Sequence, residues 1–288
     1  MKYFDLHCDT LSRCDEKNCG INRNDCAVDT ARLSGFDECY QVYAAFMPDG
    51  LSPKGALERF NRQYSIYKFS DFQRTGHVLS VENAALLDHS LYRLGYLREC
   101  SVAMLSLTWN GENCLAGGAD TDSGLTEFGR AVVSECERLG MIVDLSHLCD
   151  KSLYEVLGRI TKPPVASHSN ARSVCSHRRN LPDDALKEIF GSGGLVGINL
   201  YRDFLRDDKN ADKNSVLKHI DKMLSLGGEN SVALGTDFDG ADTCRGLKNV
   251  SDMHKLYSLI SDKFNKKTAD KIFYENAKNF FDKTPFLL

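Results

Sequence analysis

Eight short apolar segments recur along the chain, and stretches with helical periodicity separate them. Each segment has the length of a strand and is almost continuously apolar, as in strands that are buried on both faces of a parallel sheet. Two of the intervals carry clear helix signals, because Gly140 ends one apolar face and Pro182 opens another helix before Gly191. The expected strands span residues 3–6, 40–46, 77–81, 102–107, 141–145, 164–166, 195–200 and 232–234.

This alternation predicts an α/β fold with a parallel sheet. The chain has 288 residues, and no Pro-rich or Ser-rich linker divides it. Length alone would allow about two domains, but a single barrel also uses about 250 residues. We therefore expect residues 1–288 to form a single domain, a (β/α)8 TIM-type barrel. A doubly wound open sheet is the alternative, since the number of strands does not establish closure.

The composition excludes several classes of partner. Apolar residues make up 42% and charged residues 26% of the chain, and the net charge is −4. This slightly acidic balance gives no electrostatic reason to expect nucleic acid or an anionic membrane surface. No apolar run approaches the ~20 residues of a membrane span. The first seven residues lack the apolar stretch of a signal peptide, so we expect the mature chain to begin near Met1 and to stay in the cytoplasm.

Eleven cysteines are scattered along the chain, and five of them fall within the first 39 residues. A chain of this length can bury a large core without disulfides, so we interpret them as reduced, mostly buried thiols. A small zinc site at Cys14, Cys19 and Cys26 is the alternative. Their spacing lacks the C-x-x-C pairs of structural zinc sites, which favours the reduced thiols.

Polar residues of metal-binding type stand at the ends of five of the eight expected strands. All strands of a parallel barrel end at the same mouth, where residues distant in sequence converge and where barrel enzymes carry their active sites. Charged groups beside apolar strands are costly unless they are paired or bound to metal, and this convergence favours the barrel. The residues are His7 and Asp9, Glu82, His147, His168 and Asp237.

His7 and Asp9 are two residues apart on one strand, so their side chains face the same way. If Leu6 and Cys8 point outward, this imidazole and this carboxylate point into the mouth and together hold one divalent ion.

His147 and His168 come from neighbouring strands and can hold a second ion, while the two oxygens of Glu82 bridge the pair. A set of nitrogen and oxygen ligands without thiolate suits two Zn²⁺ ions best, although other divalent ions are compatible. Two ions ~3.5–4 Å apart lower the pKa of a bridging water toward ~7 and yield a hydroxide nucleophile. Asp237 is then the natural residue to take the proton of this water and pass it to a leaving amine.

The remaining polar residues receive structural interpretations. Asp239 precedes Gly240 and is interpreted as a turn former. We expect ordinary hydrogen-bonded roles for the other histidines of strands and helices, His77, His89, His219 and His254.

Six sequence blocks, in order along nearly the whole chain, carry a family resemblance. They are DLHCD at 5–9, GLTEFG at 124–129, GMIVDLSH at 140–147, SHSNARSVC at 167–175, RRNLPDD at 178–184 and GTDFDG at 235–240. With these blocks the chain resembles the membrane (renal-type) dipeptidases, peptidase family M19, among the amidohydrolase-like metal barrels. The resemblance implies a binuclear zinc dipeptidase that hydrolyses small dipeptides with a free C-terminal carboxylate.

The resemblance also implies roles for individual residues. It implies one zinc at His7, Asp9 and Glu82, a second zinc at Glu82, His147 and His168, and proton transfer by Asp237. By the same resemblance, Arg179 binds the substrate carboxylate, for which a planar guanidinium is well suited, and Tyr201 lies near the substrate.

One position departs from the family pattern. The renal-type enzymes have Leu-Thr-His after the fourth strand, and that His helps to bind and polarise the scissile carbonyl, whereas this chain has Leu107, Thr108 and Trp109. Tryptophan donates one N–H but cannot act as an imidazole. Asn110 and His177 are candidate substitutes, and Trp109 can instead form an aromatic wall against a substrate side chain.

Three other functions remain as alternatives. Trp109 motivates a related metal-dependent amidase or lactonase that acts on N-acyl amino acids or other small amides. A metal-dependent phosphoesterase is less favoured, because it would be expected to begin with His-x-His. A catalytically weak dipeptide-binding protein would be expected to have a broken ligand set, yet every expected metal position is filled. The expected partner is a small dipeptide, and a homodimer is left open.

Overall fold

Eight parallel strands close into a barrel in the computed structural model, which describes residues 1–72 and 74–284. Neighbours along the sequence are also neighbours in the sheet, and β1 pairs with β8 to complete the ring. All eight expected strands are confirmed, and the open-sheet alternative is wrong. The strands are β1 (Tyr3–Cys8), β2 (Cys39–Phe46), β3 (Thr75–Glu82), β4 (Val102–Ser106), β5 (Ile142–Asp144), β6 (Val165–Ala166), β7 (Leu195–Ile198) and β8 (Val232–Leu234).

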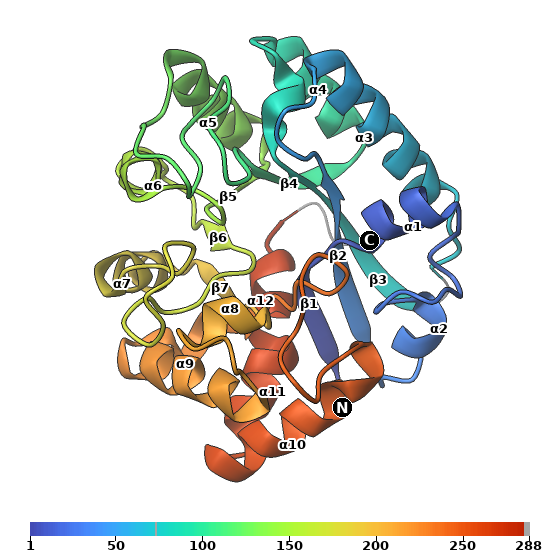
Figure 1. The fold of residues 1–288 in the computed structure, drawn as a ribbon, viewed down its shortest axis with the longest axis vertical. Coiled ribbons are helices and arrows are strands. Elements are labelled where there is room, and N and C mark those ends of the chain that lie inside the picture. Colours follow the sequence, from blue (N-terminus) through green and yellow to red (C-terminus); the bar gives the residue numbers. More distant parts are fainter. Residues whose placement is uncertain (73, 285–288) are drawn as a thin grey trace.

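Helices surround this ring of strands (Figure 1). Helix α5 ends at the predicted signal, because Gly140 takes a left-handed conformation at φ 74°, and the side chain of Thr126 caps its N-terminus. The helices are α1 (Thr10–Lys17), α2 (Thr30–Leu33), α3 (Pro53–Lys68), α4 (Leu91–Glu99), α5 (Glu127–Leu139), α6 (Asp150–Leu157), α7 (Asp183–Gly191), α8 (Arg202–Leu205), α9 (Lys213–Ser225), α10 (Met253–Lys263), α11 (Lys266–Asp270) and α12 (Asn276–Phe281).

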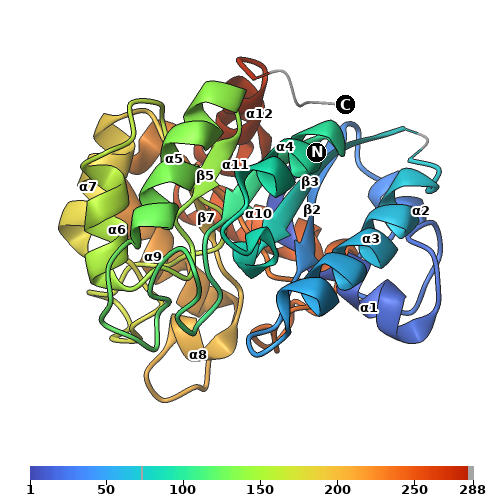
Figure 2. The ribbon, with the colours of Figure 1, turned by 90° about the horizontal axis from the view of Figure 1, so that it is seen from above.

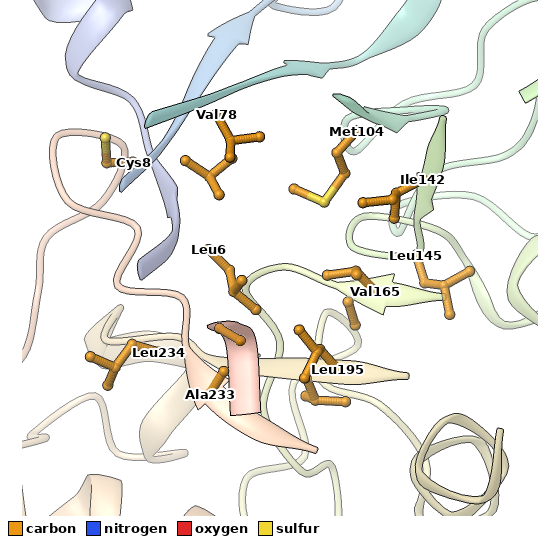
Figure 3. Packing of buried hydrophobic residues seen from close by; sticks show 14 of the residues in the cluster. Leu6, Cys8, Val78, Met104, Ile142, Leu145, Val165, Leu195, Ala233 and Leu234 are labelled. Carbon is orange, nitrogen blue, oxygen red and sulfur yellow. The ribbon is translucent and has the colours of Figure 1, made fainter. Parts of the chain in front are cut away.

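Apolar side chains fill the inside of the barrel. Figure 3 shows Leu6, Met104 and Val165 pointing into the ring of strands, whereas Cys8 lies outside it. The pairing of β1 with β2 shifts register between Asp5 and Cys8, as an extra residue in one strand produces. The expectation that Leu6 and Cys8 both point outward is therefore wrong, because the irregularity breaks the alternation of the strand.

The two ends of the barrel differ. α8 and α12 lie at opposite ends of the molecule (Figure 2). α12 lies at the end where the strands begin, and the side-chain amide of Asn276 donates to the carbonyl of Val232 at the start of β8. The mouth at the carboxyl ends of the strands is therefore on the side of α8. Among the described residues, no helix is both long enough and apolar enough to cross a membrane.

Two glycines allow close approach of β7 and β8 to the end of β6. A Cβ atom on either Gly197 or Gly235 would lie 1.9 Å from the carbonyl oxygen of Ser167, and these are backbone contacts that cannot yield easily. The chain at the ends of β6, β7 and β8 thus packs more closely than a side chain at position 197 or 235 would permit.

We predict that Gly197→Ala lowers the free energy of unfolding by about 1–3 kcal/mol, because the added methyl overpacks the barrel. Urea unfolding at equal metal content measures this. Gly95→Ala is the matched control, because the Cβ would meet nothing within 4 Å and Ala is favoured over Gly in helix α4 by up to about 1 kcal/mol. A Gly197→Ala protein as stable as the parent would contradict the packing argument.

Candidate metal centre

The predicted ligands converge at the mouth of the barrel. His7 Nε2 lies 3.2 Å from Asp9 Oδ2 and 3.4 Å from Glu82 Oε2. The other oxygen of Glu82, Oε1, lies 2.8 Å from His147 Nε2. Glu82 therefore faces a different histidine with each oxygen, which is the arrangement expected of a bridging carboxylate. The ligand atoms of His7, Glu82 and His168 all lie within 4.8 Å of one another.

The histidines that follow β5 and β6, His147 and His168, face each other with their Nε2 atoms. His147 Nε2 and His168 Nε2 are 2.8 Å apart. Nδ1 of His147 lies 3.0 Å from Oδ1, the side-chain amide oxygen of Asn110. This oxygen can only accept a hydrogen bond, so Nδ1 carries the proton.

The other imidazole is held in the same tautomer. His168 Nδ1 lies 2.7 Å from Ser167 Oγ, and this hydroxyl donates its own proton to Asp144 Oδ2 at 2.6 Å. Ser167 Oγ therefore accepts from His168 Nδ1, and both Nε2 lone pairs point at the same space. Two facing lone pairs repel each other unless a cation lies between them. Glu82 lies beside both imidazoles, so the three side chains together fit a metal ion.

Asp237 stands beside the other end of the ligand set. Its carboxylate lies within 4.8 Å of the ligand atoms of His7 and Asp9, and its Oδ2 accepts a hydrogen bond of 2.9 Å from the Asn199 amide. The backbone N–H of Asp237 donates to the carbonyl of His7, so the ends of β1 and β8 are joined directly.

Burial and charge shift the pKa values of these groups in opposite directions. Burial, followed by the charge of Asp9, raises the pKa of Glu82 to about 7, and burial raises the pKa of Asp237 to about 7. Burial lowers the pKa of His168 well below its usual value, and His7 adds to this. The carboxylates are thus crowded against one another without enough positive charge, and a bound cation would relieve this crowding.

Arg179 lies buried near these carboxylates. Its side chain is 5% exposed, and its Nε and Nη2 have no hydrogen-bond partner among the described residues. Its guanidinium carbon lies 5.3 Å from the ring centre of Phe204, which lines the mouth. Burial lowers the pKa of Arg179 to about 10, so the group stays charged at neutral pH. Buried donors without partners are costly, which suggests an anionic ligand.

A cavity of about 1000 Å³ opens over this centre, and Trp109, Asn110 and Tyr201 line it. Trp109 packs edge-on against Phe46, with ring centres 5.3 Å apart. The Tyr201 hydroxyl donates to Asp203 Oδ2 at 3.2 Å. Asn110 holds His147, as described above. His177, a candidate substitute for the family His, accepts from the backbone N–H of Arg179 and is not among the residues lining the cavity.

Three supporting residues were missed in the sequence. Asn199 holds Asp237, while Asp144 and Ser167 fix the tautomer of His168. Ser167 directly precedes the predicted ligand His168, and Asp144 is a lone acidic residue in an apolar run three residues before His147; these positions were the available signals. Nothing in the sequence around Asn199 indicated that it would contact Asp237, which lies 38 residues further along the chain.

His77, His219 and His254 have hydrogen-bond partners, as expected, whereas His89 has a ring contact with Phe128. His77 Nδ1 contacts the Tyr67 hydroxyl, and His219 accepts from the backbone N–H of Ala171. Asp239 has the left-handed φ of 70° expected of a turn, and its carboxylate also accepts hydrogen bonds from Thr10 Oγ1 and the backbone N–H of Ala27.

Comparison with known proteins agrees with this geometry. The family model of the membrane dipeptidases, peptidase family M19, matches residues 68–284. An uncharacterized protein in the pqqA 5′ region of Klebsiella pneumoniae is 35% identical over 165 residues, which are 56% of this chain and 61% of that protein. An uncharacterized dipeptidase of Schizosaccharomyces pombe is 34% identical over 200 residues, which are 66% of this chain and 48% of that protein. The match thus spans less than two thirds of either relative.

The fold is shared along the whole chain with a solved structure. The crystal structure of dipeptidase AC, a metallopeptidase of family M19, superposes with a TM-score of 0.91 and 25% identity, covering 99% of this chain and 98% of that one. The family model covers more than half of the sequence, and the barrel superposes over 99% of this chain. The chain therefore belongs to the membrane dipeptidase family, peptidase family M19.

Proposed function

We propose that this protein hydrolyses the amide bond of small dipeptides that carry a free C-terminal carboxylate, with two divalent metal ions, zinc best, as cofactors. The observation that carries the proposal is the buried guanidinium of Arg179, with unpaired donors, beside a converging set of metal-binding side chains. In a dipeptide the C-terminal carboxylate lies close to the scissile amide bond. An enzyme that hydrolyses it therefore needs a carboxylate-binding group next to the metal centre.

The ligand geometry supports two adjacent ions. His7, Asp9 and Glu82 would hold one ion, and Glu82, His147 and His168 would hold the other, since the two oxygens of Glu82 face different histidines. Bound ions would polarise the scissile carbonyl and lower the pKa of the attacking water.

Asp237 would move the proton. Asn199 fixes one carboxylate oxygen by its 2.9 Å hydrogen bond, which holds the group over the centre. Asp237 accepts a proton from the attacking water and then donates it to the leaving amine nitrogen, so that the amine departs neutral. The carbon–oxygen bond forms first by addition to the carbonyl carbon, and the carbon–nitrogen bond breaks once the nitrogen has received the proton. Asp237 is then a carboxylate again for the next cycle.

Arg179 would orient the substrate. Its planar guanidinium stacks over Phe204 and keeps its free donors for the C-terminal carboxylate. Tyr201 and Phe204 line the cavity over the metal centre, and Tyr201 would lie near the C-terminal carboxylate of the substrate. Binding at this point fixes the scissile carbonyl over the ligand set.

Trp109 and Asn110 would act differently from the family His. The indole of Trp109 forms an aromatic wall of the cavity together with Phe46, which packs a substrate side chain. Asn110 lies in the cavity as a substrate-contacting residue, and its contact with His147 Nδ1 gives it a positioning role as well.

A related amidase or lactonase is the second candidate, because Trp109 stands where the family places an imidazole. A panel of dipeptides, N-acyl amino acids and lactones separates the two, and dipeptides are expected to be the best substrates by kcat/KM. Faster turnover of N-acyl amino acids or lactones would favour the second candidate, and tight dipeptide binding without turnover would favour a binding protein. The cytoplasmic location stays a prediction, and the homodimer stays open.

We predict that Asp237→Asn keeps the metal content but lowers kcat by about 10²- to 10⁴-fold, because an amide cannot accept the proton. Metal analysis and dipeptide kinetics on the same preparation measure both quantities. Asp242→Asn is the matched control, since Asp242 lines the same cavity and is paired with exposed Arg202. Full turnover in the Asp237 variant would remove it from proton transfer.

We predict that Arg179→Ala raises KM for dipeptides by roughly 10- to 100-fold with a smaller effect on kcat, since hydrogen bonds between charged groups contribute about 1.5–3 kcal/mol. Steady-state kinetics with a dipeptide and its C-terminal amide test this, and the variant is expected to lose the preference for the free acid. The neighbouring Arg178→Ala is the control, because Arg178 is exposed and paired with Asp122. An unchanged KM in the Arg179 variant would contradict the assignment.

A further inference from the structure

Three cysteines outside the metal centre come together in the folded chain. The sulfur atoms of Cys14, Cys19 and Cys26 all lie within 4.8 Å of one another. Cys14 is fully buried, Cys26 is 7% exposed, and Cys19 is half-buried. We propose that these three thiols bind a further metal ion of thiophilic character, Zn²⁺ being the probe, at a site separate from the ligands at the barrel mouth.

The end of helix α1 brings the first two cysteines together. Asn18 takes a left-handed conformation at φ 51° and ψ 48° and ends the helix. The backbone N–H of Cys19 then donates to the carbonyl of Cys14 at 3.0 Å, and that of Asn18 donates to the carbonyl of Asp15. This is the two-bond pattern of a Schellman turn, which folds the chain back across the last helical turn. Sequence spacing alone does not reveal this fold-back.

The following loop brings in the third cysteine. The backbone N–H of Cys26 donates to Asn24 Oδ1 at 2.9 Å, and the carbonyl of Cys26 accepts from the Arg32 guanidinium at 2.6 Å. The amide of Asn24 also donates to the sulfur of Cys14 at 3.8 Å. Donors to a ligand sulfur orient it and stabilise its thiolate form, so Asn24 supports the cluster from outside.

The donor chemistry selects a soft or borderline ion. Thiolates prefer Zn²⁺ and Cu⁺ over hard cations, and three thiolates leave one position of a tetrahedral zinc for water or another external ligand. Three thiolates and Zn²⁺ carry a net charge of −1. Lys17 lies near Cys26, but so does Asp239, and Arg32 is paired with Asp29, so the neighbours offset this charge only in part. A disulfide would use only two of the sulfurs and would require an oxidant, so the metal site accounts for more of the cluster.

The cluster is connected to the main centre through the loop that carries it. Cys26 lines the large cavity, and the next residue, Ala27, donates its backbone N–H to Asp239 Oδ1 at 2.7 Å. The other oxygen of Asp239 accepts from Thr10 at the start of α1. An ion at the cysteines would therefore fix one wall of the cavity, and this wall is hydrogen-bonded to Asp239, two residues after Asp237 along the chain.

Cobalt substitution tests the proposal on the whole protein. Reduced, metal-free protein is titrated with Co²⁺, and a thiolate-to-cobalt charge-transfer band is expected in the near ultraviolet. None of the five ligands proposed for the main centre is a cysteine, so this band reports on the cluster alone. Cys19→Ser, at the half-buried position, is expected to lose the band and about one equivalent of bound zinc, whatever the main centre holds. Cys114→Ser, at a half-buried cysteine outside the cluster, is the control and keeps both.

Two results of the cobalt titration would overturn the proposal. One is the absence of the band in the unaltered protein, a measurement that does not depend on any variant folding. The other is a band that survives in Cys19→Ser. A mass two daltons below the reduced value in freshly purified protein would instead show a disulfide and would also overturn it.

Discussion

The site depends on the repulsion between groups that the barrel forces together. His147 Nε2 and His168 Nε2 point their lone pairs at each other across 2.8 Å, and the carboxylates of Asp9, Glu82 and Asp237 crowd the same buried space. Outside a protein these groups would separate. Here each is attached near the end of a strand in a closed ring, and hydrogen bonds behind them hold the two imidazoles in place, so a bound cation would relieve the repulsion.

Backbone conformation shows the same constraint. His147 and Asp237 both have positive φ, at 74° and 60°, three residues after the ends of strands β5 and β8. Non-glycine residues adopt this region at a cost, and they keep it where surrounding structure determines it. The left-handed turns direct both side chains back over the mouth of the barrel. The close packing allowed by Gly197 and Gly235 supplies the rigid base from which these turns depart.

Much of this architecture could be predicted from the sequence, and the physical reason differs from feature to feature. Continuous apolar runs identify buried parallel strands, and polar residues such as Glu82 and His168 at their ends identify the mouth, because both signals are local. The irregularity in β1 depends on pairing with β2, so strict alternation misplaced Leu6, which points into the barrel. The support of His168 by Asp144 and the gathering of Cys14, Cys19 and Cys26 depend on contacts or turns that spacing does not encode.

Anomalous diffraction at the zinc edge, from crystals of protein purified without added ions, tests the central claim most directly. The account predicts two peaks at the barrel mouth on either side of Glu82, one beside His7 and Asp9 and the other beside His147 and His168. Absence of density there, with the imidazoles of His147 and His168 turned away from each other, would contradict it.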